Sequence, residues 1–246
     1  MKALGAVGKL ARALAHAAGG WITVTFRFPR CSPAQREATV QAWAGQMLRI
    51  LGVPLRVEGC PPAEGPLLLV SNHLSWLDIL VLHAARHCRF VSKSDVKHWP
   101  LIGALATGAG TLYIEREKRR DAMRVVHHMA ESLRAGEIVA VFPEGTTGDG
   151  EDLLPFHGNL IQAAISAEVP VQPVALRFVD RRTGQDCPGP LYLGDDTLLA
   201  SVWRTLAGPP FEAHVRFGEP ETAQGRDRRA WAHDLREVVA RLRERA

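Results

Sequence analysis

The stretch GPLLLVSNHLSWLD, residues 65–78, joins an apolar strand to a polar turn and then to the start of a helix. Its residues 67–70 are four consecutive large apolar side chains, the pattern of a strand that is buried on both faces. The run IVAV, residues 138–141, repeats the pattern and also leads into a polar turn. Strands of this kind belong to sheets that are covered by helices on each side.

Outward from these two strands, the chain alternates between strand-like and helix-like segments. Further strands are expected at residues 89–95, 111–117 and 169–178. Helices are expected at residues 34–51, from Ser75 through 86, at 119–135, at 159–167 and over the last twenty residues. This order predicts an α/β fold, with a mixed, largely parallel central sheet covered by helices on both faces.

Composition excludes several classes of protein. The 246 residues are 46% hydrophobic and 23% charged, with a net charge of +4, which describes a folded chain able to bury its own core. The four cysteines are widely spaced, so neither a disulfide scaffold nor a zinc ribbon is expected. The histidine pairs at 83/87 and 127/128 lack the H-E-x-x-H pattern, so no metal site is expected. No uncharged apolar run reaches the length of a membrane-spanning helix.

The N-terminal segment has the pattern of a helix that lies on a membrane surface. On a helical wheel of residues 2–18, Lys2, Lys9, Arg12 and His16 fall within roughly 80° of one another, opposite an apolar stripe. We expect Gly19-Gly20 to end this helix. Two alternatives remain open: packing of the apolar stripe on the protein's own core, and a secretory signal, which the interrupting charges disfavour.

Polar groups follow the strand at 67–70, and the first pair is His73 and Asp78. Across a strand-to-helix turn, the carboxylate of Asp78 is able to hold one ring nitrogen of His73 and leave the other free as a general base. The alternative is a capping box, in which Asp78 reaches back to the amide of Ser75 and serves only the helix.

The second polar turn is FPEGTT, residues 142–147. A glutamate, a glycine and two hydroxyls in one tight turn suit a polyol or an anion. The alternative is an ordinary turn between a strand and a loop, which an isolated P-E-G sequence does not exclude.

The two turns, in this order, resemble two hallmark blocks of the glycerolipid acyltransferase family, whose best-known members are the 1-acylglycerol-3-phosphate acyltransferases. The family's four blocks are N-H-x-x-x-x-D, G-x-x-x-I-x-R, F-P-E-G-T and an apolar strand with prolines. They are matched by Asn72, His73 and Asp78, by Gly110, Ile114 and Arg116, by Phe142 through Thr146, and by residues 169–176. The resemblance covers most of residues 70–176.

This resemblance implies acyl transfer from a thioester, on coenzyme A or acyl carrier protein, to a lipid hydroxyl, with no cofactor besides that co-substrate. By analogy His73 is the base and Asp78 orients it. The groups implied to hold the acceptor's head group are Arg116, Glu144, Gly145 and Thr146, with Lys93 as a further candidate for phosphate or oxyanion contact. Because a thioester is already activated, we expect direct attack without an acyl-enzyme.

The family resemblance also bears on organisation and location. It implies an N-terminal helical element on the membrane, so residues 1–30 are expected to associate with a membrane surface. Residues 31–246 are then expected to form a single acyltransferase domain. The predicted location is peripheral, on the cytoplasmic face of the cell membrane.

The sequence departs from many phosphatidate-forming relatives at two places. Those relatives follow F-P-E-G-T with an arginine, where this chain has Thr147, and they carry a basic pair where it reads Pro155-Phe156-His157-Gly158. Because acylation of 1-acylglycerol 3-phosphate is the commonest activity in the family, this lipid is the first candidate acceptor. The form F-P-E-G-T-T-G-D-G resembles the lyso-ornithine lipid acyltransferases and makes that lipid the alternative.

Two other functions were weighed. His73, Ser75 and Asp78 suggest the triad of a thioesterase or hydrolase, but the G-x-S-x-G elbow is missing. Arginines in residues 226–245 suggest nucleic-acid binding, but interleaved acidic residues favour a solvated helix face. We therefore expect no nucleic-acid partner.

Overall fold

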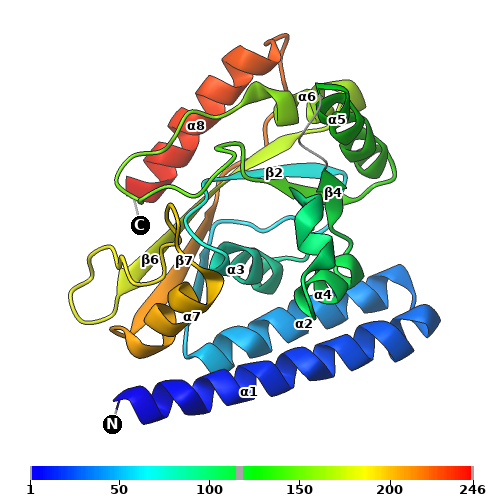
Figure 1. The fold of residues 1–246 in the computed structure, drawn as a ribbon. Coiled ribbons are helices and arrows are strands. Elements are labelled where there is room, and N and C mark those ends of the chain that lie inside the picture. The colour runs from blue at the N-terminus through cyan, green and yellow to red at the C-terminus, as the bar shows by residue number, and fades with distance from the viewer. Residues whose placement is uncertain (1, 115–118, 245–246) are drawn as a thin grey trace.

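One mixed sheet forms the centre of the molecule. The computed structural model describes residues 2–114 and 119–244, and there seven strands lie in the order β1-β7-β6-β2-β5-β3-β4 (Figure 1). The strands are β1 (Leu55–Glu58), β2 (Leu67–Ser71), β3 (Arg89–Lys93), β4 (Leu112–Ile114), β5 (Ile138–Val141), β6 (Val171–Asp180) and β7 (Phe211–Phe217). The predicted mixed α/β class is confirmed.

The direction of the strands brings the polar turns together. Strand β2 is parallel to both of its neighbours, β5 and β6, and β5 continues through β3 to β4 in the same direction. Only the β6–β7 pairing is antiparallel among the described strands. The carboxyl ends of β2, β5, β3 and β4 therefore share one edge of the sheet, where ligands of such sheets bind.

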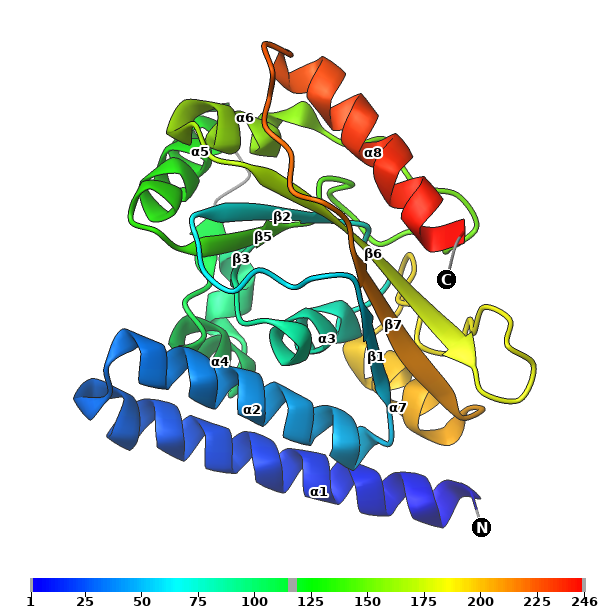
Figure 2. The same cartoon turned by 180° about the vertical axis from the view of Figure 1, so that it is seen from behind.

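Two layers of helices cover the sheet. The helices are α1 (Lys2–Ile22), α2 (Pro33–Leu51), α3 (Leu77–Ala85), α4 (Ile102–Gly108), α5 (Arg119–Arg134), α6 (Gly158–Ala167), α7 (Leu198–Ala207) and α8 (Arg228–Glu244). Helices α5, α6 and α8 lie on one face, and α1, α2, α3 and α7 lie on the other (Figures 1 and 2). Strand β2 contributes side chains to the core on both faces of the sheet, since Leu69 belongs to one core cluster and Leu68 and Val70 belong to the other. That alternation explains the continuous apolar run.

Local signals set the ends of α2. Ser32 and Gln35 form a reciprocal capping box, and Pro33 occupies the first turn. At the other end Gly52 has a φ of 78°, the left-handed conformation that glycine adopts most readily. The helix therefore runs over nearly the residues that the sequence predicts.

Helix α1 continues past the glycines that were expected to end it. It reaches Ile22 and passes into a π-helical turn, Thr23–Arg27, so the predicted stop at Gly19-Gly20 is wrong. The reason is packing, because a Cβ on Gly20 would lie 2.6 Å from the indole nitrogen of Trp43 on α2. Gly20 is needed for the close approach of two helices and not for a turn.

The inward face of α1 consists of small side chains and Leu10, whereas most of its large apolar side chains are exposed. Ala6 is buried, Ala13 and Ala17 pack against the same core cluster, and Leu10 is only partly buried. By contrast Leu4 is 80% exposed and Leu14 is 57% exposed. The alternative in which the apolar stripe as a whole packs on the core is therefore wrong. No described helix combines the length and the apolar character needed to cross a bilayer.

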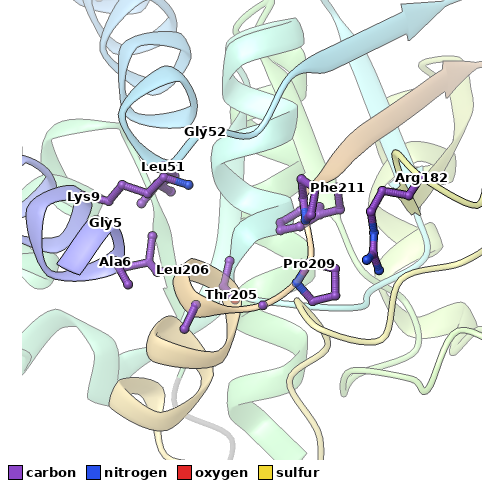
Figure 3. Close-up of a pocket in the computed structure, with 13 residues that line it drawn as sticks. Gly5, Ala6, Lys9, Leu51, Gly52, Arg182, Thr205, Leu206, Pro209 and Phe211 are labelled. Atoms are coloured by element: carbon purple, nitrogen blue, oxygen red, sulfur yellow. The ribbon is translucent and has the colours of Figure 1, made fainter. Parts of the chain in front are cut away.

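The predicted basic stripe of α1 is divided between α2 and solvent. His16 stacks on Trp43 at 5.0 Å between ring centroids and lies 3.0 Å from its carbonyl oxygen, whereas Arg12 is exposed. Lys9 reaches toward the C-terminal end of α2, beside Gly52. It lines a cavity of about 390 Å³ where α1 meets the ends of α2 and α7 (Figure 3). No residue that lines this cavity belongs to the four blocks.

A buried histidine makes the fold sensitive to acid. His83 on α3 lies between the rings of His87 and Phe90, and burial lowers its pKa to about 3. In the unfolded chain the same group binds a proton below about pH 6.5. Its contribution to stability is therefore complete above pH 6.5 and is lost progressively as the pH falls from 6.5 toward 3.

We predict that the free energy of unfolding falls by about 2 kcal/mol between pH 7 and pH 5 through His83 alone. Urea titrations at both pH values measure it, with His83→Phe as the variant that removes the titrating group and keeps a ring. The variant should lose about 2 kcal/mol less than the wild type over this interval. Equal losses in the two proteins would contradict the assignment.

Candidate active site

The first polar turn holds an imidazole against a carboxylate. The Nδ1 atom of His73 lies 2.7 Å from Oδ2 of Asp78, the distance of a strong hydrogen bond. Asp78 is fully buried, while 20% of the His73 side chain is exposed. A carboxylate accepts the bond, so Nδ1 carries the hydrogen and Nε2 is left as the basic nitrogen. The geometry is that of a general base with an orienting partner.

Asp78 also does what the capping alternative requires. The same Oδ2 accepts the backbone N–H groups of Leu74 at 2.6 Å and Ser75 at 2.8 Å. One oxygen thus holds the imidazole and the first amides of the turn that leads into α3. The contacts that each interpretation requires are both present, because the ring and the amides converge on one atom, and the role of His73 as base stays a prediction.

Glu144 joins the two polar turns. Its Oε1 accepts the backbone N–H of His73 at 2.9 Å, and its Oε2 accepts that of Leu154 at 3.2 Å. Only 5% of the residue is exposed. Burial raises the pKa of the Glu144 carboxyl above its usual range, and the two N–H groups act in the opposite direction. Glu144, which the resemblance predicts to bind the head group, therefore contacts the backbone of His73.

Two further groups of the second turn contact His73. The ring of Phe142 stacks on the imidazole with 4.0 Å between centroids and 7° between planes. The N–H of Gly148 donates to the carbonyl oxygen of His73 at 2.8 Å. Sequence reasoning matched Phe142 as part of a block without giving it a role, and it did not find Gly148.

Of the other predicted site residues, Gly145 and Thr146 lie on the second turn and Lys93 ends β3. Gly145 has a φ of 75°, which explains the glycine, and both it and Thr146 are exposed on the turn. Lys93 is exposed at the carboxyl end of β3, in register with Ile114 on β4. Arg116 lies outside the described residues.

A segment without any motif closes the site on another side. The hydroxyl of Ser75 donates to the carbonyl oxygen of Pro190 at 2.6 Å, and Tyr192 donates its N–H to the carbonyl of Leu74 at 3.0 Å. Thr147 in turn donates its hydroxyl to the Tyr192 carbonyl. Because Ser75 is fully buried and its hydroxyl is occupied, the triad of the hydrolase alternative is not assembled.

The C-terminal arginines have structural partners. Arg236 donates to the carbonyls of Leu153 and Leu154, and Arg243 donates to that of Gly150. Arg226 forms ion pairs with Glu221 and Asp234. Arg236 and Arg243 thus hold the loop that follows the second turn, while Arg226 pairs with carboxylates near the start of α8.

Comparison with known proteins agrees with this geometry. Residues 55–177 match the family model described as Acyltransferase, which is half of the chain and contains both polar turns. The chain belongs to the acyltransferase family. The recognition made from the four blocks is therefore confirmed, and the enzyme class is that of an O-acyltransferase acting on lysophospholipids or related lipids.

Similar curated proteins include enzymes named for two different acceptor lipids. The chain is 38% identical to a lyso-ornithine lipid O-acyltransferase of Pseudomonas aeruginosa over 92% of this chain and 87% of that protein. It is 34% identical to a 1-acyl-sn-glycerol-3-phosphate acyltransferase of Neisseria meningitidis over 85% of this chain and 82% of that one.

A solved structure has the same fold. It is the 1-acyl-sn-glycerophosphate acyltransferase PlsC of Thermotoga maritima, with a TM-score of 0.68 and 19% identity, over 95% of both chains. At this identity the likeness concerns the fold alone.

We predict that His73→Ala lowers the rate of acyl transfer ~10²–10⁴-fold, the usual contribution of a general base. Release of free thiol from the thioester donor in the presence of lysolipid measures the rate. The change also removes one donor from the buried Asp78 carboxylate and so lowers the melting temperature, and the rate is therefore measured at a temperature where the variant is folded. His127→Ala on the exposed face of α5 is the control. A variant that retains wild-type turnover would show that another group takes the proton.

Proposed function

We propose that this enzyme transfers a fatty acyl group from a coenzyme A or acyl carrier protein thioester to the free hydroxyl of lyso-ornithine lipid. The observation that carries the reaction type is the His73–Asp78 pair, with Nδ1 held at 2.7 Å and Nε2 left as the base. The acceptor is inferred from the second turn and from the relatives. The second candidate acceptor is 1-acylglycerol 3-phosphate.

The proposed reaction needs one base and an oriented hydroxyl. Nε2 of His73 takes the proton of the lipid hydroxyl as its oxygen attacks the thioester carbonyl carbon. The carbon–sulfur bond then breaks, and the departing thiolate recovers the proton from the imidazolium. The hydroxyl of Ser75 is donated to Pro190, and Cys88 and Cys187 are buried, so these groups are not placed to form an acyl-enzyme. This supports direct transfer.

Two positions near the second turn favour an acceptor without phosphate. Thr147 stands where many phosphatidate-forming relatives carry arginine, and its hydroxyl is occupied by the Tyr192 carbonyl. His157 stands in the place of one of their basic residues, and its ring lies 3.5 Å from where a Cβ of Gly145 would be. A site with fewer permanent cations has less to offer a phosphate.

The relatives support both acceptors. Proteins named lyso-ornithine lipid O-acyltransferase, from Pseudomonas aeruginosa and from Brucella abortus, are 38% and 37% identical to this chain. The 34% identical protein of Neisseria meningitidis named for 1-acyl-sn-glycerol-3-phosphate is the reason to keep that lipid as the second candidate.

We predict that kcat/KM is at least about tenfold higher for lyso-ornithine lipid than for 1-acylglycerol 3-phosphate, since one missing charged hydrogen bond to phosphate costs ~1.5–3 kcal/mol. Both acceptors are compared in one mixed-micelle assay, with acyl-CoA and with acyl carrier protein as donors. Thr147→Arg should bring the kcat/KM values for the two acceptors closer together, because it supplies a cation for the phosphate. Thr147→Val, which adds no charge, is the control. A ratio that favours the phosphate acceptor would transfer the assignment to the second candidate.

We also propose peripheral binding to the cytoplasmic face of the cell membrane through α1. Its outward side chains form an apolar face, which consists of Leu4, Val7, Leu14, Trp21, Ile22 and, in the following turn, Phe26. Exposed apolar groups on a basic helix suit the boundary between lipid head groups and acyl chains. The acceptor is itself a lipid, so such binding brings the enzyme to its substrate.

We predict that the double variant Leu14→Gln, Trp21→Gln weakens binding to anionic phospholipid vesicles on the order of tenfold or more, because each large apolar side chain contributes ~1.5–3 kcal/mol on burial. Vesicle flotation measures the bound fraction. Met123→Gln, an exposed apolar residue of α5 on the other helical layer, is the control. Flotation equal to that of the wild type would remove the role assigned to α1.

A further inference from the structure

We propose that the turn of residues 142–148 is the support that positions the base, and that Glu144 is a positioning residue and not a ligand of the acceptor's head group. The inference rests on the proposed function, because it takes His73 as the base. It departs from the role that the sequence resemblance implies for Glu144.

The turn holds the backbone of His73 from both sides. The N–H of His73 donates to Oε1 of Glu144, and the carbonyl of His73 accepts the N–H of Gly148. Strand β2 ends at Ser71, so neither of these groups has a partner in the sheet ladder. The turn of residues 142–148 thus supplies the two backbone hydrogen bonds that a neighbouring strand would otherwise make with His73. These bonds fix the backbone of His73 beyond the end of β2.

The same turn fixes the plane of the imidazole. Phe142 stacks on one face of the ring, and Phe90 stacks behind Phe142 at 5.6 Å between centroids. Asp78 holds the Nδ1 edge. A ring with one face and one edge occupied has little freedom about χ1 and χ2, so the direction of Nε2 is set before any lipid binds.

Glu144 has little capacity left for a substrate. Each of its two carboxylate oxygens already accepts a backbone N–H, and only 5% of the residue's surface is exposed. A head group would therefore have to reach oxygens that the surrounding turn and the loop at Leu154 largely shield from solvent. The exposed residues of the turn, Gly145 and Thr146, are the ones accessible to an acceptor.

The turn of residues 142–148 is itself held in place by the loop that follows it and by helix α8. Leu154, whose N–H reaches Oε2 of Glu144, has its carbonyl held by Arg236 of α8. His157 donates its N–H to the carbonyl of Pro143 at 2.8 Å. A continuous series of hydrogen bonds therefore runs from α8 through the loop and Glu144 to the base.

The test is Glu144→Gln, a change of nearly equal shape whose amide group turns an NH₂ toward one of the two N–H donors. Positioning predicts that kcat falls about 10²-fold, the loss expected for a base displaced by about 1 Å, while the acceptor KM keeps its wild-type value. The downfield proton resonance of the His73–Asp78 hydrogen bond should weaken through faster exchange with water. Glu151→Gln, exposed in the same loop, should leave both readouts unchanged.

The opposite pattern overturns the inference: a raised acceptor KM with kcat preserved at saturation, and an unaltered proton resonance. If Glu144→Gln does not fold, Phe142→Leu tests the same support through the ring contact, with the same expected loss of kcat at constant KM. A wild type that acylates no lysolipid would refute the proposed function instead, and the proton resonance of the two variants would still test the positioning.

Discussion

A single carboxylate oxygen organises the site. Oδ2 of Asp78 accepts the Nδ1–H of His73 and the amides of Leu74 and Ser75, and the residue is fully buried. A carboxylate taken out of water costs several kcal/mol unless donors compensate it. Because all three donors belong to one short turn, the turn has to adopt the conformation that satisfies them together. The direction of the imidazole and the start of α3 are therefore set by the same electrostatic requirement.

Parallel pairing supplies what this turn lacks on its own. His73 and Glu144 are 71 residues apart along the chain, yet they meet because β2 and β5 are neighbours that end at the same edge. On the other side of β2, the amide of Asn72 exchanges two hydrogen bonds with the backbone of Leu176 in β6. Three of the four blocks thus mark the ends or the interior of adjacent strands. Their proximity in space is a consequence of the order of the strands in the sheet.

The sequence predicts what is local and leaves out what depends on distant contacts. The apolar runs at β2 and β5 predict a sheet that is covered on both faces, and the spacing of His73 and Asp78 predicts their imidazole–carboxylate pair. Strand β7 was missed, although FEAHVRF alternates apolar and polar residues as a half-buried strand does. Its nearly complete burial depends on the pairing with β6 and β1, which no local pattern shows. The segment at Pro190 and Tyr192 has no motif, since its role depends on bonds to Ser75 and Leu74 more than a hundred residues away. Gly20 was misinterpreted because its small size serves a neighbouring helix.

The two sides of helix α1 differ in their contacts, since one side packs against the protein and the other is exposed. Ala6, Ala13, Ala17 and Gly20 fit it against its neighbours, while Leu4, Leu14 and Trp21 take no part in that fit. Substitutions of exposed residues such as Leu4 and Leu14 therefore have little effect on the free energy of unfolding, and the lipid attachment proposed for α1 can be altered without changing the site at His73. The same independence has a cost in the test tube. Away from lipid, this surface is a site for self-association, and micelles or amphipathic polymers are the natural means of keeping the enzyme monodisperse.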